Sequence, residues 1–371
     1  MRVLYCIETF LPHIGGAQVL AYQFVSAMRN RGHEIAIVTS MSTLDQNSES
    51  TLDNIPVYRF PFFKVLAERN IVQIAETKKQ VSALWKSFHP DLVHLNSTGP
   101  DNFFYLQESK AFSTPILVTL HGLPMSSHFD KDDLFHVSLR AASWITTVSE
   151  AVLSKARKIS PDISSRSSFI YNGLKPPQTR PNLLNFDQPV LLGIGRLFPH
   201  KGFDLAISAF SGIAHRFPMA QLIIAGDGPS RTDLEEQTKC LQLTSRVSFK
   251  GWIPPENISE LINQATIIIM PSRREPFGLV ALQAGQMARP IVATRVDGLP
   301  EVVRHNETGL LVESEDSQAI ATAITYLLEH PKQAIQMGQR AKQWVQKAFS
   351  FERHLDEYEK LYQNLANTTH D

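Results

Sequence analysis

The feature that most constrains the fold is an alternation of short apolar runs with longer segments of helical periodicity, which continues along almost the whole chain. This alternation is typical of a parallel sheet covered by helices. It breaks between residues 175 and 189, where four prolines and no periodicity predict a linker or hinge. Because 371 residues also exceed the size at which a single core keeps growing, we expect two α/β domains.

The strand–helix rhythm on either side of this break predicts two doubly wound, Rossmann-like domains that face each other across a cleft. Residues 1–174 would form the first domain and residues 190–350 the second. Ligands of such sheets bind at the carboxyl ends of the strands. Helices are expected at residues 17–30 and about 351–367. The expected strands are residues 3–7, 34–39, 92–95, 116–120, 144–148, 168–171, 190–194, 221–225, 247–249, 266–270, 290–293 and 309–312.

Composition excludes several classes of protein. Lysine plus arginine and aspartate plus glutamate number 36 each, with no basic stripe, so we expect no nucleic-acid partner. The two cysteines are far apart in sequence, which predicts reduced thiols rather than a disulfide framework. The N-terminus does not resemble a signal peptide, and no apolar run approaches the roughly 18 residues of a membrane helix. We therefore expect a cytoplasmic protein.

Residues 59–88 leave peripheral contact with the inner membrane face open, because they mix apolar and basic side chains. Such a segment could form an amphipathic surface that touches anionic lipid or a lipid-borne acceptor. A solvated helix face packed on the sheet is the favoured interpretation.

The first candidate ligand site is Gly15-Gly16, just before the helix expected at residues 17–30. A glycine pair there lets backbone N–H groups at a helix start approach an anion. Taken alone, the pair is explained better by a plain tight turn. The second candidate is Arg196 with Lys201, after the strand expected at residues 190–194. Two cations at a strand end suit a diphosphate leaving group, and two solvated surface cations are an equally weighted alternative.

The third candidate lies between residues 270 and 283, where a strand ends, a loop carries Glu275, and Pro276 stands where helices tend to begin. Glu275 and Gln283 are eight residues apart, about two helical turns, so we expect both to line one wall. One would contact a sugar and the other a ribose. The backbone N–H groups expected to offer a positive helix end to a phosphate belong to Phe277, Gly278 and Leu279.

Together these motifs resemble glycosyltransferase family 4, the retaining enzymes of the GT-B fold. The resemblance covers nearly the whole chain. The matching motifs, in order, are Gly15-Gly16, Arg31-Gly32-His33-Glu34, Thr119-Leu120-His121-Gly122, Val148-Ser149-Glu150, Asn172-Gly173, Gly195-Arg196 with Lys201-Gly202, Ala225-Gly226-Asp227-Gly228-Pro229, Glu275-Pro276-Phe277-Gly278 and Thr308-Gly309-Leu310-Leu311-Val312.

The resemblance implies that Arg196 and Lys201 hold the donor diphosphate and that Glu275 contacts the transferred sugar. It also implies that His121 faces this sugar from the N-terminal domain, and that the helix at about residues 351–371 crosses back onto that domain. Trp252 and Ile253 would belong to the turn that recognises the nucleobase. The full set of implied donor-binding residues is Gly15, Gly16, Asp227, Gly228, Trp252, Ile253, Phe277, Gly278, Leu279 and Gln283.

Three positions depart from the family's pattern. Gln283 stands where the family usually has a glutamate that accepts hydrogen bonds from the ribose. A charge-assisted bond of roughly 1.5–3 kcal/mol is thereby replaced by a neutral bond of about 1 kcal/mol. Gly122 replaces a frequent aspartate, and Gln18 replaces a frequent glutamate. These changes bear on the identity of the donor more than on the class of reaction.

Other chemistries find less support in the sequence. Asp130-Lys131-Asp132 spells the Asp-x-Asp pattern that binds a divalent metal in the other major glycosyltransferase fold, but an acidic helix N-terminus explains it without a metal. We expect neither a metal nor another cofactor. No complete Gly-x-Gly-x-x-Gly, Walker or nucleophile-elbow motif supports a nicotinamide enzyme, a kinase or a serine hydrolase.

The sequence thus predicts a metal-independent, retaining glycosyltransferase that uses a nucleotide-diphosphate sugar, with a UDP-sugar favoured over a GDP-sugar. The acceptor would be a glycan, a glycolipid or a small metabolite. Two alternatives stay open: a sugar-nucleotide epimerase or phosphorylase of related architecture, and a non-catalytic transferase-like subunit. The sequence makes no prediction of the oligomeric state.

Overall fold

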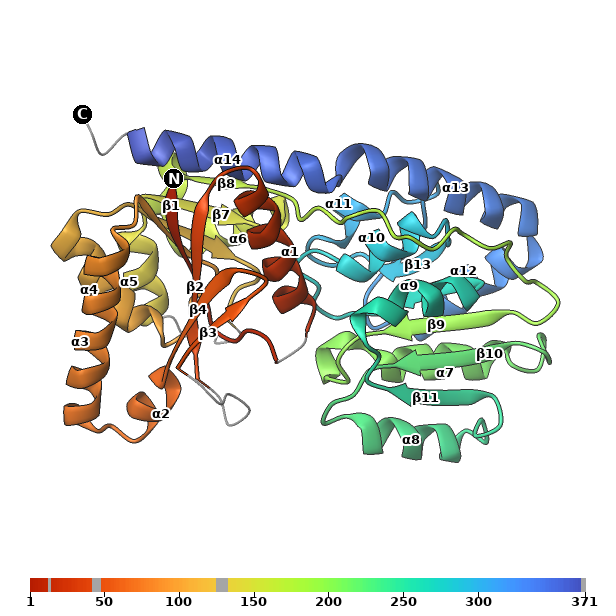
Figure 1. The fold of residues 1–371 in the computed structure, drawn as a ribbon. Helices are drawn as coiled ribbons and strands as arrows, with labels where there is room; N and C mark the ends of the chain where they lie inside the picture. The colour runs from red at the N-terminus through yellow and green to blue at the C-terminus, as the bar shows by residue number, and fades with distance from the viewer. Residues whose placement is uncertain (13–14, 42–47, 125–132, 368–371) are drawn as a thin grey trace. The chain divides into compact units, whose positions relative to one another are not determined.

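The structure, a computed structural model, describes residues 1–12, 15–41, 48–124 and 133–367 (Figure 1). The chain divides into two compact units. Unit 1 comprises Met1–Tyr171 together with Glu352–Asp371, and unit 2 comprises Asn172–Phe351. The strands expected in both halves of the chain are present, with ends that match or differ by at most two residues.

Within the described residues, unit 1 is built on an eight-stranded sheet in the order β3-β4-β2-β1-β5-β6-β7-β8. Neighbouring strands are parallel except for β3 and β4. Because β2 pairs on one side of β1 and β5 pairs on the other, the direction of winding reverses between β1 and β5. The strands are β1 (Arg2–Ile7), β2 (Glu34–Ser40), β3 (Glu49–Leu52), β4 (Ile55–Phe60), β5 (Leu92–Leu95), β6 (Ile116–Leu120), β7 (Trp144–Thr147) and β8 (Ser167–Phe169).

The expected strands include none between residues 40 and 91, whereas the structure contains the hairpin of β3 and β4 there. Asp53 and Asn54 connect the two strands with positive φ angles of 46° and 63°, and Leu52 pairs with Ile55. Positive φ at both central residues is the geometry of the two-residue hairpin turn that matches strand twist, and Asp and Asn tolerate it. The Asp53-Asn54 dipeptide was therefore the available signal for this hairpin.

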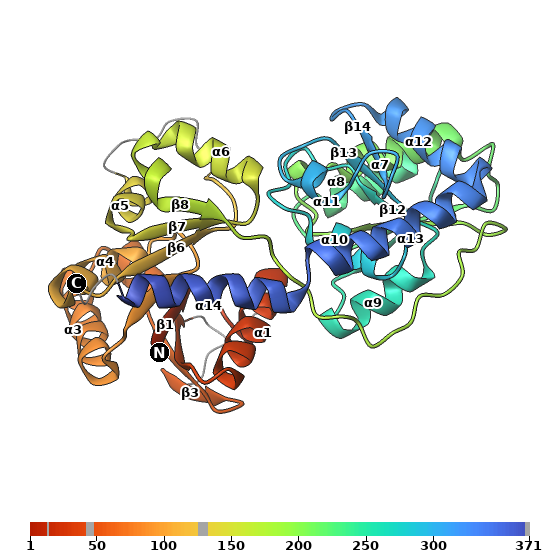
Figure 2. The same cartoon turned by 90° about the horizontal axis from the view of Figure 1, so that it is seen from above.

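Helices of unit 1 flank its sheet (Figures 1 and 2). The C-terminal helix packs across the end of α1, where Arg31 forms ion pairs of 2.7–2.8 Å with Glu352, Asp356 and Glu359. The helices are α1 (Gly16–Asn30), α2 (Phe62–Ala67), α3 (Ile71–Phe88), α4 (Asn102–Phe112), α5 (Leu134–Ala141), α6 (Glu150–Ile159), the 3-10 helix η1 (Pro161–Arg166) and α14 (Phe351–Asn367), which joins unit 1 from Glu352 onward.

Residues 59–88 form the end of β4 together with α2 and α3. Their large apolar side chains Phe60, Phe62, Trp85 and Phe88 are buried in unit 1, which favours a packed helix face over a lipid-binding surface for these positions. Ile71 and Val72, at the start of α3, are exposed. None of the helices in the described ranges is long and apolar enough to cross a membrane.

Unit 2 is built on a parallel six-stranded sheet in the order β11-β10-β9-β12-β13-β14. Here the winding reverses between β9 and β12. The strands are β9 (Val190–Ile194), β10 (Gln221–Ala225), β11 (Val247–Gly251), β12 (Ile267–Met270), β13 (Ile291–Thr294) and β14 (Leu310–Val312). The helices are the 3-10 helix η2 (Pro199–Lys201), α7 (Phe203–Ile213), α8 (Arg231–Cys240), α9 (Pro255–Gln264), α10 (Leu279–Gln286), α11 (Leu299–Val302), α12 (Ser317–Glu329) and α13 (Pro331–Ala348).

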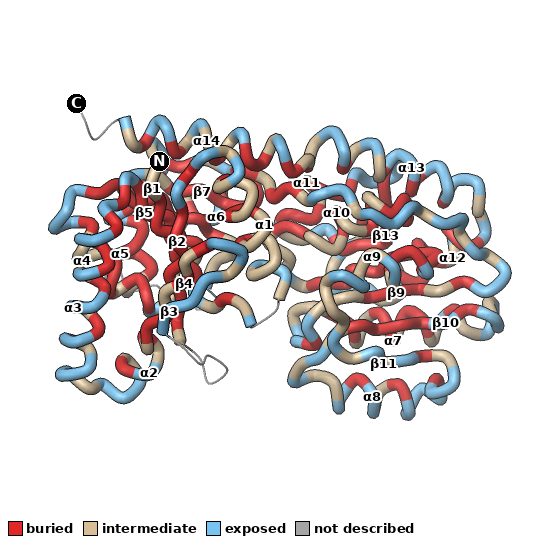
Figure 3. Tube along the Cα trace, in the orientation of Figure 1, coloured by how far each residue is buried: buried red, intermediate tan, exposed pale blue. Residues whose placement is uncertain are grey.

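Apart from the edge strand β11, the strands of unit 2 are mostly buried on both faces (Figure 3). On one face, alternate strand residues such as Leu191 and Ile267 form a continuous core with α7 and α12, which contribute Phe210 and Ile324. The intervening residues, such as Ile268, are buried as well. Burial on both faces explains why these strands are near-continuous apolar runs in the sequence instead of alternating patterns.

The proline-rich segment at residues 175–189 has no helix or strand, yet it is fixed to unit 2. The side chain of Asn263 accepts from the Asn182 N–H at 2.7 Å and donates to the Arg180 carbonyl at 2.8 Å. Buried Arg289 donates to the Asn182 carbonyl at 2.8 Å, and Thr266 donates to the Asn185 carbonyl at 2.7 Å. Side chains of unit 2 thus supply the backbone partners that a strand or helix would otherwise provide.

Candidate active site

The candidate site of unit 2 lies where the winding of its sheet reverses, at the carboxyl ends of β9 and β12. Ligands of open α/β sheets bind at such a point because the loops that follow the two strands diverge. Here the two loops touch each other. The His200 carbonyl accepts from the Arg273 N–H at 2.8 Å. Gly202 has a φ of 68°, and a Cβ there would lie 2.0 Å from the Pro271 carbonyl oxygen, so the approach requires glycine.

This contact brings Lys201 and Glu275 together. Lys201 Nζ donates to Glu275 Oε2 at 2.6 Å, and the two side chains are only 20% and 12% exposed. The Glu275 backbone N–H donates to Asp297 Oδ2 at 2.8 Å, which fixes the loop that carries the carboxylate. An ion pair this shielded is held more tightly than an exposed one. The residues predicted to hold a diphosphate and a sugar are therefore direct neighbours.

Further cations lie at the same sheet edge. Arg196 follows β9 and is exposed, with its guanidinium carbon 5.2 Å from the centre of the Phe198 ring. Burial lowers the pKa of His200, and the neighbouring charges of Lys201 and Arg196 lower it further. Arg274 is exposed and contributes in the same direction. Arg196, Lys201 and Arg274 thus gather positive charge at this sheet edge, which suits a phosphate or diphosphate.

The start of α10 differs from the expectation in one respect. The helix begins at Leu279, not at Pro276, because Gly278 adopts a φ of 108° and breaks the helical path. Glu275 is therefore not part of the helix, and the expected spacing of two helical turns between Glu275 and Gln283 was wrong. Gln283 lies in the second turn of α10 and is partly exposed.

The N–H groups of Gly278 and Leu279 have no hydrogen-bond partner within the described part of the chain. They lie at the positive end of an eight-residue helix, where an anion would be stabilised. Phe277 has a different environment, because its side chain is 3% exposed and its ring lies 5.8 Å from that of Phe349. Its side chain is thus a core residue.

The predicted nucleotide-binding turns lie at the carboxyl ends of β10 and β11, at the same edge of the sheet. Gly226 donates to the Gly251 carbonyl at 2.7 Å and joins these ends. Asp227 is exposed, and its carboxylate accepts from the Gly228 N–H at 2.8 Å. Beyond β11, Trp252 is 54% exposed and Ile253 partly exposed. An exposed indole at this edge offers a stacking surface.

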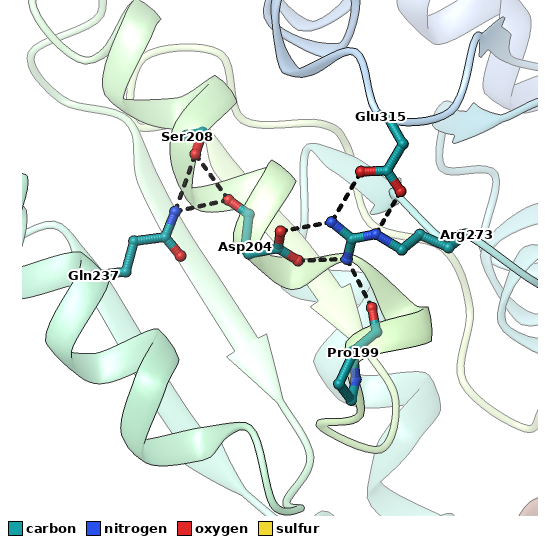
Figure 4. Close-up of polar contacts among 6 residues, drawn as sticks. All are labelled: Pro199, Asp204, Ser208, Gln237, Arg273 and Glu315. Atoms are coloured by element: carbon teal, nitrogen blue, oxygen red, sulfur yellow. Dashed lines mark hydrogen bonds and ion pairs between the residues drawn. The ribbon is translucent and has the colours of Figure 1, made fainter.

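Arg273 is a central residue of this site that was not singled out from the sequence (Figure 4). Its guanidinium donates two hydrogen bonds to the Asp204 carboxylate at 2.8 and 2.7 Å, two to the Glu315 carboxylate and one to the Pro199 carbonyl. These bonds and charges raise its pKa. Arg273 thus fixes the loop after β12 to α7. In the sequence Arg273 is adjacent to Arg274, and no local signal shows which of the two arginines forms the ion pairs.

The remaining predicted residues belong to unit 1. His121 follows β6, and its Nε2 lies 2.9 Å from Asn96 Oδ1. Burial lowers the pKa of His121 to about 4, so the imidazole is neutral near pH 7. An amide oxygen only accepts, so Nε2 carries the proton and Nδ1 is left as an acceptor. Gly15 and Gly16 begin α1, and the neighbouring Gln18 side chain donates to Thr9 Oγ1 at 2.7 Å.

No group of three or more His, Cys, Asp or Glu residues in the described ranges is arranged to hold a metal ion. The Asp-x-Asp sequence at residues 130–132 lies outside the described residues.

The two parallel-sheet α/β units have the GT-B fold of glycosyltransferases. Sucrose-phosphate synthase of Thermosynechococcus elongatus superposes with a TM-score of 0.84 at 23% identity, covering 99% of both chains. HepE of Anabaena, in complex with UDP and glucose, superposes with a TM-score of 0.79 at 21% identity, covering 98% of this chain and 99% of that one. At these identities the likeness shows the shared fold.

Sequence comparison gives the family. Residues 14–176 match the model described as Glycosyltransferase Family 4, and residues 175–344 match the one described as Glycosyl transferases group 1. The chain is 24% identical to N-acetyl-alpha-D-glucosaminyl L-malate synthase of Bacillus anthracis, over 96% of both chains. It is 31% identical to alpha-D-kanosaminyltransferase of Streptomyces kanamyceticus over 48% of this chain and 47% of the other. The protein belongs to the group 1 glycosyltransferases of family 4.

Proposed function

We propose that this chain transfers a sugar from a UDP-sugar to a hydroxyl-bearing acceptor, with retention of the anomeric configuration and without a metal ion. In this proposal unit 2 binds the donor and unit 1 binds the acceptor. The observation that carries it is the Lys201–Glu275 pair at 2.6 Å, beside Arg196 and the open N-terminus of α10.

These groups match the demands of the reaction. The bond between the anomeric carbon and the diphosphate oxygen breaks, and negative charge grows on the departing diphosphate. Arg196, Lys201 and the N–H groups of Gly278 and Leu279 are donors that stabilise such charge. Glu275 holds the Lys201 ammonium on one side and accepts hydrogen bonds from sugar hydroxyls on the other.

Retention is what the family resemblance implies, and the proposal assigns no enzymatic nucleophile that would give it through two successive displacements. The acceptor oxygen attacks from the face that the leaving group departs from. Its proton passes to the departing phosphate oxygen, so UDP and the glycoside are the products. The preference for UDP is supported by its presence in the HepE complexes, and it agrees with the exposed Trp252 beside the β10 and β11 turns.

The test is binding followed by turnover. Ligand-detected NMR with UDP, GDP, ADP and their glucose conjugates should show the tightest binding for UDP compounds. Candidate acceptors are then incubated with UDP-sugars in EDTA, and products are identified by mass spectrometry and by the anomeric coupling constant. Preferential GDP binding, loss of turnover in EDTA or an inverted product would each overturn the corresponding part of the proposal.

Two other outcomes correspond to the alternatives. Turnover that needs inorganic phosphate and no nucleotide would identify a phosphorylase. Nucleotide binding without transfer, restored by a second protein, would identify a non-catalytic subunit. The name of the yeast relative, a GPI3 subunit of phosphatidylinositol N-acetylglucosaminyltransferase, shows that one relative works within an assembly.

A further inference from the structure

The sheet of unit 1 reverses its winding between β1 and β5, and this second strand-end position carries an unusual pair of acids. Glu8 follows β1 directly, and Asp101 lies in the turn after β5, at the start of α4. Because β1 and β5 are paired neighbours, their following loops begin at one point of the sheet edge. The position is equivalent to the one that carries Arg196 and Glu275 in unit 2.

Asp101 is the stronger anomaly of the two. The residue is completely buried, and neither of its carboxylate oxygens has a hydrogen-bond partner within the described part of the chain. It precedes α4 without capping the helix through its side chain. The N–H groups of Asp101 and Asn102 are near enough to favour the ionised carboxylate, but neither forms a hydrogen bond of good geometry with it, and the Asn102 N–H donates instead to the Gly99 carbonyl at 3.1 Å. An unpaired buried carboxylate is costly, and such cost is typical of a functional site.

The Glu8 carboxylate lies close to the buried Asp101 carboxylate, beside Gly99. A Cβ placed on Gly99 would meet Asp101 Oδ1 at 2.6 Å and Glu8 Oε2 at 3.3 Å, so both carboxylates face the same point. Glu8 is exposed to solvent, whereas Asp101 is not. Desolvation raises the pKa of Glu8, and desolvation followed by the Glu8 charge raises the pKa of Asp101 to about 7.

The surroundings of the pair are polar but lack a balancing charge. Ser97 Oγ and Asn102 Oδ1 are buried without partners at the same loop. Neither acid forms an ion pair with a lysine, arginine or histidine in the described ranges. Two carboxylates do not make up a metal site of three or more ligands, and none is found there. The groups best suited to the pair are neutral or cationic hydrogen-bond donors.

We propose that Glu8 and Asp101 form the acceptor-recognition site of unit 1, and that this site selects an acceptor rich in hydroxyl groups and free of negative charge. An acceptor hydroxyl donates to the Glu8 carboxylate. Asp101 is a positioning residue, which lies behind Glu8 and keeps the local potential negative. This inference rests on the proposed transfer reaction and deepens it.

The same charges exclude anionic acceptors such as dicarboxylates. A carboxylate brought to Glu8 and Asp101 would meet like charge in a partly desolvated site, where repulsion is stronger than in water. A neutral sugar or cyclitol and an amino sugar share the chemistry that fits, and the choice between them is left to the experiment.

The experiment uses the full chain at about pH 8, where both acids are charged. Binding of myo-inositol, D-glucose, D-glucosamine and L-malate is followed by ligand-detected NMR in the presence of UDP. The polyhydroxyl probes should bind and L-malate should not. The Glu8→Gln variant should weaken the polyhydroxyl probes by about tenfold to a hundredfold, the range expected for a charge-assisted hydrogen bond. The affinity for UDP should stay unchanged.

Two further variants separate the recognition role from a structural one. Asp101→Asn should allow L-malate to bind without changing UDP binding, which a mere loss of stability would not do. Glu76→Gln, at an exposed position on α3, is the matched control and should change nothing.

The outcomes that contradict the inference are distinct from those that contradict the proposed function. Binding of L-malate by the natural protein, failure of every polyhydroxyl probe, or unchanged binding in Glu8→Gln would overturn the inference while UDP binding still supported the transferase. Absence of UDP binding with intact, Glu8-dependent probe binding would instead overturn the donor assignment.

Discussion

The Lys201 ammonium lies 2.6 Å from the Glu275 carboxylate and links the loop after β9 to the loop after β12. The two residues are 74 positions apart in sequence. The pair has two consequences for a bound diphosphate sugar. Lys201 is oriented before the ligand arrives, and part of its charge is balanced until negative charge grows on the leaving group. Preorganised charge of this kind stabilises a transition state without reorganisation at the moment of reaction.

Removing the carboxylate should separate binding from transfer. In Glu275→Gln, Lys201 loses its counter-charge, so UDP affinity should be equal to or higher than that of the natural protein. Transfer should fall by about a hundredfold to a thousandfold, the scale of a lost transition-state contact. Lys201→Met should weaken both. Calorimetry measures the UDP affinity and a product assay measures the transfer rate. Lys239→Met, on the exposed face of α8, is the control. Full transfer activity in Glu275→Gln would contradict the assignment.

The Arg273 contacts predict a coupled loss of stability and activity. Arg273→Met removes the bonds to Asp204, Glu315 and Pro199. The side chains of Asp204 and Glu315 are 41% and 58% exposed. Because solvent screens such pairs, we expect Arg273→Met to lower the free energy of unfolding by about 1–3 kcal/mol. Transfer should fall as well, because the loop that carries Glu275 loses its anchor.

Thermal unfolding and the product assay measure the two effects of Arg273→Met. Arg295→Met, which removes a more exposed pair with Glu313 at 3.4 Å, is the matched control and should cost less than about 0.5 kcal/mol. Equal effects of the two variants would show that Arg273 has no special role.

Asp101 predicts an unusual dependence of stability on pH. Its pKa in the folded protein is about 7, against an ordinary value of 3.8. Between about pH 4 and pH 7 the folded state therefore binds more protons than the unfolded state, and stability falls as pH rises through this window. Asp101→Asn removes the effect, so it should be more stable than the natural protein at about pH 8, by no more than about 4 kcal/mol.

Urea unfolding at about pH 5 and about pH 8 tests this difference between the natural protein and Asp101→Asn, and Glu8 is present in both. A variant that gains stability while it loses acceptor selectivity would show the trade-off expected at a functional site. If the difference between the two proteins does not change with pH, Asp101 is ionised and paired in solution.

Gly226 predicts a strong constraint on the turn that follows β10. Its φ is 138°, and a Cβ would lie 1.9 Å from the Gly195 carbonyl oxygen. Gly226→Ala should therefore destabilise unit 2 by about 2–4 kcal/mol and weaken UDP binding, because the turn must move away from β9. Gly212→Ala is the control, since no atom lies within 4 Å of the added Cβ and α7 gains up to about 1 kcal/mol of helix propensity. Chemical denaturation of both variants measures the contrast.

Gln283 predicts how the protein contacts a ribose. Gln283→Glu should tighten UDP binding by about twofold to thirtyfold, because a charge-assisted hydrogen bond replaces a neutral one. Titration calorimetry with UDP and with uracil compares the nucleotide with a ligand that lacks the ribose. An unchanged or weaker UDP affinity would place the Gln283 side chain away from the ribose hydroxyls.

Several features of this protein follow from the sequence alone. The alternation of apolar runs and helical segments predicts the strands, because burial in a parallel sheet requires local runs such as Ile267–Met270. It also predicts that Arg196 and Glu275 follow strand ends, and therefore lie at the edge where ligands bind. The hairpin of β3 and β4 escaped this prediction because its turn, Asp53-Asn54, is a signal of two residues and not of periodicity.

Only the tertiary structure decided which of these residues meet. The order of strands places β9 beside β12 and β1 beside β5, and no local pattern encodes that order. This strand order brings Lys201 next to Glu275. It also lets Arg273 pair with Asp204, while Arg274 stays exposed. It also buries Asp101 next to Glu8, which raises the pKa of Asp101, whereas a carboxyl in a surface loop would keep its usual pKa. The physical reason is that charge and burial depend on distances through space, whereas a sequence pattern records only the local demands of each helix and strand.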